Sequence, residues 1–164
     1  MLYQIHTCQK LPTTLETAWN FLSAPENLET ITPKMGFKIL SGAGTAMFQG
    51  QIIQYTIAPF PGIRTRWVTE ITHLSDKNYF VDEQRFGPYA FWHHKHFITE
   101  VEGGVLMEDI VDYKLPLGIL GRLMHTLVVK RKLKAIFEYR AMQLITLFGK
   151  TDDEQTSITI KKIC

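Results

Sequence analysis

Between residues 37 and 113, short turn signals separate six strand-like segments. The segments are rich in β-branched and aromatic residues and read FKIL, MFQGQIIQYTI, RTRWVTEITHL, NYFVDEQRF, AFWHHKHFITEV and GVLMEDIVDYKL. The dividers, at 41–44, 59–62, 75–78, 87–88 and 103–104, contain Gly, Pro or Asn. Parallel strands need crossover connections of about a dozen residues or more. Because these dividers are much shorter, the sequence predicts an antiparallel meander.

Helical patterns lie on both sides of this region. Residues 2–9 suit a first strand, and apolar residues at helical spacing follow over 15–22, with Thr13 or Thr14 as the N-cap. Pro25 marks the start of a second short helix that extends to about residue 31. The sequence therefore predicts two short helices between the first and second strands.

A long amphipathic helix is predicted after Pro116. Its apolar residues keep a helical period to about Phe148, and we expect a break near Gly121 or His125 that leaves a main helix from about Leu127. A curved sheet must cover its apolar concave face, and this helix is the available cover. The expected fold is α+β, with about seven antiparallel strands around a C-terminal helix and an internal cavity. We expect one domain over 1–148 and a flexible polar tail over 149–164, in which SITIKKI at 157–163 could instead form a weak strand.

Composition excludes several classes of function. The 164 residues are 45% hydrophobic and 21% charged, and the net charge is +2, so no general attraction to nucleic acid is expected. Cys8 and Cys164 lack the spacing of a disulfide framework or a metal site. There is no signal-peptide pattern at the start and no apolar run of about 18 residues, which predicts a cytoplasmic protein. We expect no cofactor.

Residues 87–97, GPYAFWHHKHF, are the strongest functional signal. In a strand, Trp92, His94 and His96 share one face and Lys95 lies on the other. Because a charged lysine favours water, the Trp92 face is predicted to point inward. An aromatic ring beside two groups that titrate near neutral pH suits a ligand pocket better than a plain core.

Neighbouring strands supply polar and aromatic residues of matching alternation. Asp82, Gln84, Asp109 and Tyr113 could converge with the histidines, and the candidate ligand-binding residues are Tyr55, Trp67, Asp82, Gln84, Trp92, His94, His96, Asp109 and Tyr113. Three interpretations stay open. The polar groups could form a buried structural network, orient a ligand, or act in acid–base catalysis through His94, His96, Asp82 and Asp109. A physiological metal is not expected, although two histidines at i and i+2 with an aspartate could bind one.

The segment VVKRKLKAIF carries the only basic run. Lys130, Arg131, Lys132 and Lys134 are predicted to form the solvated face of an amphipathic helix, and weak contact with anionic membrane lipids is the alternative. Arg140 is expected to pair with an acidic group whose identity the sequence leaves open.

The order of these motifs resembles the START/Bet v 1-like superfamily, also called the SRPBCC or helix-grip fold. The resemblance covers about 1–148 and rests on AWNFLSAPENLETITP at 18–33, GQIIQYTI at 50–57, RWVTEIT at 66–72, FVDEQRFGPYAFWHHKHF at 80–97, MEDIVDYKLPLGILGRLMH at 107–125 and VKRKLKAIFEYR at 129–140. It is nearest to a bacterial subgroup described as ligand-binding, polyketide cyclase/dehydrase-like or cell division inhibitor proteins. The resemblance implies a helix-grip fold around a cavity.

Members of this superfamily bind lipids, hormones, polyketides or quinones, or catalyse cyclisation and dehydration, on one architecture. We therefore expect binding of a small, largely hydrophobic molecule between the sheet and the C-terminal helix, and whether a reaction is catalysed stays open. The alternatives are a cyclase or dehydratase that uses His94 and His96 for proton transfer, and a module that delivers a lipid or quinone at a membrane surface.

Overall fold

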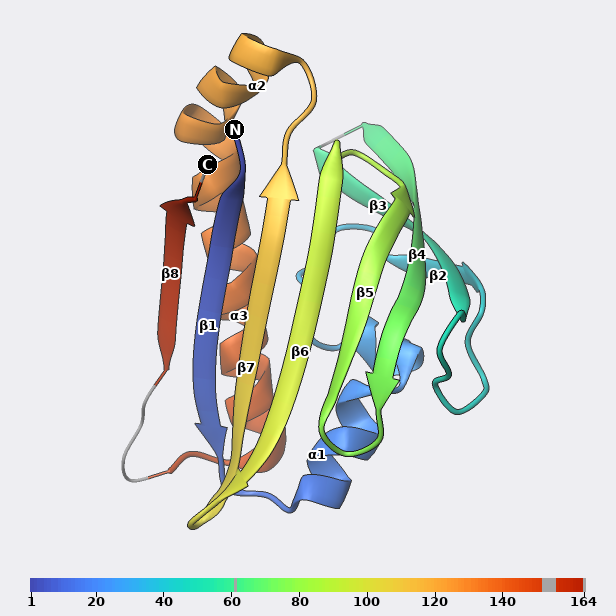
Figure 1. Ribbon diagram of the computed structural model, residues 1–164, viewed down its shortest axis with the longest axis vertical. Helices are drawn as coiled ribbons and strands as arrows, with labels where there is room; N and C mark the ends of the chain where they lie inside the picture. Colours follow the sequence, from blue (N-terminus) through green and yellow to red (C-terminus); the bar gives the residue numbers. More distant parts are fainter. Residues whose placement is uncertain (61, 152–155, 164) are drawn as a thin grey trace.

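The computed structural model describes residues 1–60, 62–151 and 156–163. Eight antiparallel strands form one curved sheet in the order β2-β3-β4-β5-β6-β7-β1-β8 (Figure 1). The strands are β1 (Tyr3–Leu11), β2 (Lys38–Ser41), β3 (Ile52–Phe60), β4 (Ile63–Ser75), β5 (Tyr79–Phe86), β6 (Phe91–Val101), β7 (Gly104–Lys114) and β8 (Ser157–Lys162). The predicted meander from β2 to β7 is confirmed, and with it the α+β helix-grip architecture.

The helices lie on one face of the sheet. They are α1 (Leu15–Leu22), the 3₁₀ turn η1 (Pro25–Glu29), α2 (Gly118–Met124), the π-helical turn η2 (His125–Val129) and α3 (Lys130–Phe148). The Thr14 side chain caps α1 by accepting a hydrogen bond from the backbone N–H of Thr17. The long helix α3 crosses behind β1 and β7 (Figure 1). No helix in the described part of the chain is both long and apolar enough to cross a bilayer.

A π-helical turn, η2, stands where the sequence predicts a break in the long helix. His125 begins this turn and is buried. Its Nε2 lies 2.8 Å from the Tyr113 hydroxyl oxygen, and its ring stacks on Tyr3 with centroids 3.5 Å apart. These contacts hold the start of the long helix against β1 and β7, so the helix changes its winding there instead of ending.

Residues 157–162 correct the expectation of a flexible C-terminal tail. They form β8, which pairs antiparallel with β1 from Ser157↔Cys8 to Lys162↔Tyr3. The segment SITIKK alternates apolar and polar residues, and the half-buried Ile158 and Ile160 pack on the apolar cluster around Tyr3. Pairing also satisfies the edge of β1, which would otherwise expose unpaired backbone groups. Residues 152–155 and 164 of the predicted tail lie outside the described residues.

Three apolar clusters lie between the sheet and the helices. One lies under α1 around Trp19 and Phe80, one lies under α3 around Phe137, and one lies at the β3–β4 end around Trp67. Along β7, buried and half-buried residues alternate strictly. This alternation fixes which side chains of β7 face α3 and which face away from it.

Gly121 allows α2 to approach the loop that precedes it. A Cβ atom at this position would lie 2.0 Å from the carbonyl oxygen of Pro116. We expect Gly121→Ala to lower the free energy of unfolding by about 1–3 kcal/mol, because the backbone must shift to relieve the overlap. Thermal unfolding measures this loss. Leu120→Ala, in the same helix but at an exposed side chain, is the control and should melt close to the wild type. Equal melting of the two variants would contradict the close approach.

Candidate ligand-binding cavity

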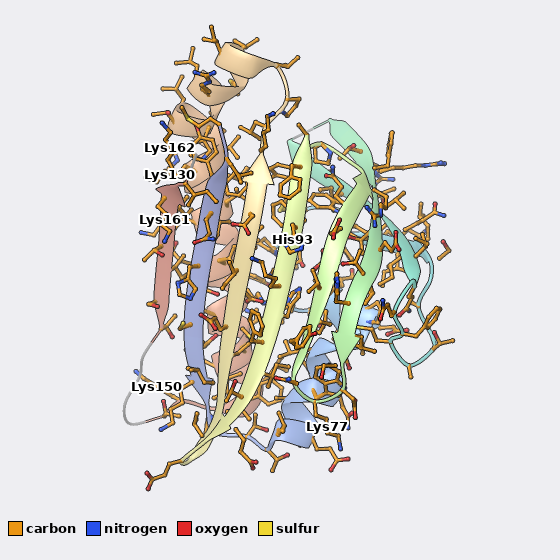
Figure 2. The ribbon with its side chains drawn as sticks, in the orientation of Figure 1. Lys77, His93, Lys130, Lys150, Lys161 and Lys162 are labelled. Carbon is orange, nitrogen blue, oxygen red and sulfur yellow. The ribbon has the colours of Figure 1, made fainter. Side chains whose placement is uncertain are left out.

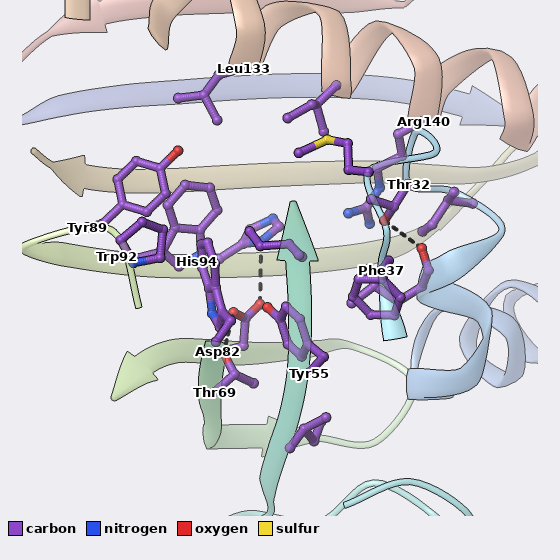
Figure 3. A pocket seen from close by; sticks show the side chains of 18 of the residues that line it. Thr32, Phe37, Tyr55, Thr69, Asp82, Tyr89, Trp92, His94, Leu133 and Arg140 are labelled. Atoms are coloured by element: carbon purple, nitrogen blue, oxygen red, sulfur yellow. Dashed lines mark hydrogen bonds and ion pairs between the residues drawn. The ribbon is translucent and has the colours of Figure 1, made fainter. Parts of the chain in front are cut away.

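A cavity of about 510 Å³ lies between the concave face of the sheet and the long helix. Figure 3 shows its two sides, with Tyr55, Thr69 and Asp82 on the sheet and Leu133 and Arg140 on α3. Its walls are mostly apolar, and all three apolar clusters contribute to them. Small-molecule sites commonly have about 300–1,000 Å³ and apolar walls with a few convergent polar groups. The cavity has the size and character of such a site.

Polar groups meet on the sheet side because β5, β6 and β7 are neighbours. In the strand register, Asp82 faces His94 and His96 faces Asp109. The four side chains share the inward face, as the alternation of the sequence predicts, and His94, His96 and Asp109 are buried. Lys95 lies on the opposite face and pairs with Asp112 at 2.9 Å. The predicted orientation of β6 is therefore confirmed.

Two carboxylates enclose the two imidazoles. His96 lies between them, with Nε2 2.8 Å from Asp82 Oδ2 and Nδ1 2.8 Å from Asp109 Oδ1. His94 is held more loosely, with Nδ1 3.4 Å from Asp82 Oδ2 and Nε2 3.1 Å from Asp109 Oδ1. The two rings are packed with their centroids 3.6 Å apart. Asp109 is fully buried behind the histidines, whereas Asp82 lines the cavity.

Arg140 connects this cluster to α3. Its Nη2 lies 3.5 Å from Asp109 Oδ1, so Asp109 is the acidic partner that the sequence leaves open. With two carboxylates and one guanidinium, one further positive charge balances the cluster, since unbalanced buried charge is costly. Each histidine has one ring nitrogen facing each carboxylate, and the shorter contacts of His96, 2.8 Å on both sides, favour it as the carrier of this charge.

The electrostatic environment shifts the pKa values of His94 and His96 in opposite directions. Burial alone would lower the pKa of His96, but hydrogen bonds to Asp109 and Asp82 raise it above 6.5. Burial and the neighbouring His96 lower the pKa of His94 below 6.5. Burial alone would raise the pKa of Asp109, yet the charge of Arg140 and hydrogen bonds from both histidines hold it well below 3.8. The pKa values of the two neighbouring imidazoles are therefore shifted in opposite directions.

An aromatic wall adjoins the polar cluster. The Trp67 ring stacks on Tyr55 with centroids 5.8 Å apart and meets Trp92 edge-on at 5.2 Å. Tyr89, from the turn between β5 and β6, packs on both tryptophans, with centroids 5.6 Å and 4.8 Å away. This wall gives the cavity flat apolar surfaces, which suit a ring-containing or otherwise planar molecule.

Most of the candidate residues from the sequence lie in the cavity lining, and three do not. The lining contains Tyr55, Trp67, Asp82, Trp92, His94 and His96. Gln84 instead bonds the backbone N–H and C=O of Tyr89 and closes the turn. Asp109 lies one layer behind the histidines, and Tyr113 is covered by His125. Alternation along a strand predicts the face correctly, but other segments decide which side chains on that face remain open to the cavity.

Several residues of the cavity were missed from the sequence. Thr69 donates its hydroxyl to Asp82 Oδ1 at 3.3 Å, and the alternation that it shares with Trp67 could have identified it. Tyr89 lies in a turn and Phe37 in a loop before β2, where no periodicity applies. Within the described residues, Trp67 Nε1 and Arg140 Nε are buried donors without a hydrogen-bond partner. Both residues line the cavity.

Asp82, His94 and His96 also form a donor set that could hold a metal ion, since one ligand atom of each lies within 4.8 Å of the others. Two imidazoles and one carboxylate suit a transition metal. A proton on His96 meets the same need, because it satisfies Asp82 and Asp109 together. On the outer face, His6, Cys8 and Glu108 form a second such group.

Comparisons with known proteins find similarity in structure. No protein-family model matches the chain, and no curated protein matches its sequence. A Chromobacterium violaceum protein has a TM-score of 0.68 at 13% identity, covering 90% of this chain and 99% of its own. A START superfamily protein from Mycobacterium smegmatis has a TM-score of 0.67 at 13% identity, covering 89% of this chain and 97% of its own.

Ara h 8.0201, a Bet v 1-like protein, extends the comparison, with a TM-score of 0.58 at 15% identity over 89% of this chain and 99% of its own. Identities this low establish the fold alone, and the agreement covers nearly the whole of each chain. The chain therefore has the START/Bet v 1-like helix-grip fold.

Proposed function

We propose that this protein binds a small, largely hydrophobic molecule that carries at least one hydrogen-bond acceptor. The observation that carries the proposal is the apolar cavity with one polar cluster on its sheet side. Apolar burial supplies affinity, at about 25 cal/mol per Å² before the costs of association. The polar cluster sets the orientation and selectivity of the bound molecule. Lipid-like, polyketide-like and quinone-like molecules share this chemistry.

The acceptor requirement follows from the unpartnered donors. Trp67 Nε1 and Arg140 Nε are buried, and a buried donor without a partner costs about 1–3 kcal/mol. Both residues line the cavity, and a carbonyl or hydroxyl oxygen of a bound molecule would satisfy either donor once a small shift of the side chain opens the nitrogen to the cavity. Selectivity against molecules that lack such an oxygen then arises because their binding leaves the donor unpaired.

Trp67→Phe tests this requirement. A suitable probe is 2-acetylnaphthalene, an apolar two-ring molecule with one carbonyl oxygen, titrated by calorimetry. We expect affinity to fall about tenfold in Trp67→Phe, since the indole donor is lost. Trp19→Phe is the matched control because Trp19 is equally buried and lies outside the lining. Equal weakening in both variants contradicts the role of Trp67. If the wild type releases no heat and carries no compound in native mass spectrometry, the binding proposal is wrong.

The protonation of His96 predicts a pH dependence of stability. A pKa raised on folding stabilises the protein fully below 6.5, the pKa in the unfolded chain, and this contribution disappears as the pH rises through the folded pKa. We therefore expect His96→Gln to cost about 3 kcal/mol in mildly acidic buffer and less in alkaline buffer. Thermal unfolding across this range measures the difference. His73→Gln, at an exposed histidine, should show no such trend. A cost that is independent of pH contradicts a protonated His96.

Acid–base catalysis is the second candidate function, and the opposite pKa shifts of His94 and His96 favour it. Neighbouring groups whose pKa values are driven apart can serve as a base and an acid at one pH. For a cyclase or dehydratase, we expect His94→Gln to lower kcat about 100-fold with little change in binding, because proton transfer is lost. For a binder, the same variant changes affinity and no turnover is found. Product analysis with a polyketide-like substrate distinguishes the two.

A further inference from the structure

The helix α2 carries its apolar side chains on the outside of the protein. Leu120, Leu123 and Leu127 follow one another at helical spacing, while Gly121 and His125 occupy the buried side. A soluble amphipathic helix has the reverse arrangement. The apolar ridge, as we call this surface, has side chains that are 55–79% exposed and consists of Leu117, Ile119, Leu120, Leu123 and Leu127. Single exposed leucines are ordinary, but a contiguous apolar patch indicates an interaction surface.

The backbone at the start of the ridge supports this interpretation. Leu117 has a φ of 66°, a left-handed conformation that residues with a Cβ rarely adopt. Its side chain is 73% exposed, so packing inside the protein does not explain the conformation. Strained backbone that the fold nevertheless retains is concentrated at functional sites.

The surroundings of the ridge are basic. Residues 113–137 include six Lys and Arg and no Asp or Glu. Arg122, Lys130 and Arg131 are exposed and form no ion pair within the described part of the chain. The strand β8 packs against α3 and adds the exposed Lys162, which is paired with the inward-facing Tyr3 of β1. Lys161 is paired with Gln4 and lies on the outer face of the sheet. Figure 2 labels Lys162 and Lys130 at the end of the molecule from which α2 projects.

Only part of the basic run at 130–134 is placed where it can contact a membrane. Lys130 and Arg131 are exposed beside the ridge, but Lys132 lines the cavity and Leu133 is buried. Lys134 is exposed and lies 3.5 Å from Glu138. The candidate membrane surface therefore lies closer to α2 than the basic run alone indicates, because the exposed apolar side chains are on α2.

We propose that α2 and its basic surroundings dock on an anionic lipid bilayer, with the apolar ridge inserted at the level of the headgroups. Leucines beside exposed lysine and arginine, in a stretch of chain without Asp or Glu, match a negatively charged apolar surface in both properties. The loop before α2 and its inner side also border the cavity, through Pro116, Leu117, Gly121 and Met124. A docked bilayer thus lies beside one end of the cavity. Docking concerns residues outside the polar cluster, so it can be tested without any ligand.

The test is co-sedimentation with vesicles of phosphatidylcholine containing phosphatidylglycerol, at low salt, compared with vesicles of phosphatidylcholine alone. We expect binding to the anionic vesicles, at least about tenfold weaker binding to the neutral ones, and loss of binding on addition of salt. Leu120→Ser/Leu123→Ser should weaken binding by about tenfold or more for each leucine. Leu147→Ser, at an exposed leucine near the far end of α3, is the control and should bind as the wild type does.

A second pair of variants separates charge from apolar insertion. Lys130→Glu/Arg131→Glu should weaken binding to anionic vesicles about 20-fold or more, since each basic side chain contributes about fivefold near such a surface. Lys34→Glu/Lys38→Glu changes the net charge equally at exposed residues in and just before β2, at the opposite edge of the sheet, and should have little effect. Circular dichroism confirms that all variants are folded.

Three results would overturn the proposal. The wild type could remain in the supernatant with both kinds of vesicle, or the leucine variants could bind as tightly as the wild type. In the third, the protein does not bind vesicles but forms a dimer in analytical ultracentrifugation, and Leu120→Ser/Leu123→Ser dissociates this dimer. That result assigns the ridge to a second copy of the chain. None of them bears on ligand binding in the cavity.

Discussion

The buried charge of Asp109 is the constraint on which this structure depends. A fully buried carboxylate requires positive partners inside the protein, and here Arg140 and the two histidines provide them. Because Arg140 belongs to α3 and Asp109 to β7, this ion pair joins the helix to the sheet. The same partners position His94 and His96 so that their remaining nitrogen atoms face Asp82 and the cavity. One electrostatic requirement thus links the packing of the helix to the geometry of the polar cluster.

The cavity follows from the shapes of its two walls. The concave sheet and the straight helix α3 meet at the apolar clusters but leave space between them, and large aromatic rings surround that space without filling it. Dense packing is the rule in protein interiors, and empty apolar volume carries a cost in stability. The proposed bound molecule would offset this cost by filling the apolar volume.

Several apolar side chains of the long helical segment are buried along α3, whereas those of α2 are exposed. Along α3, residues such as Phe137 and Leu144 face the sheet and contribute to the core. On the N-terminal side of the π-helical turn, α2 exposes Leu120 and Leu123 at the protein surface and buries Gly121. His125 stands at the change, since its contacts with Tyr3 and Tyr113 fix the helix to the sheet. The helix can therefore cover the cavity along its length and present a different surface beyond the end of the sheet.

Local sequence patterns determined the order of the strands and the faces on which many of their side chains lie. The short dividers predicted the antiparallel meander, and alternation by two placed His94 and His96 inside and Lys95 outside, because both depend only on neighbouring residues. Alternation allowed a weak strand at β8 but could not show that it forms, because its pairing depends on the free edge of β1, far away in the sequence. Nor could it show that Gln84 turns away to bond Tyr89, that Arg140 meets Asp109, or that Leu120 faces outward. These features arise only where distant segments meet, since a repeating pattern specifies the face of an element and only tertiary packing decides what covers it.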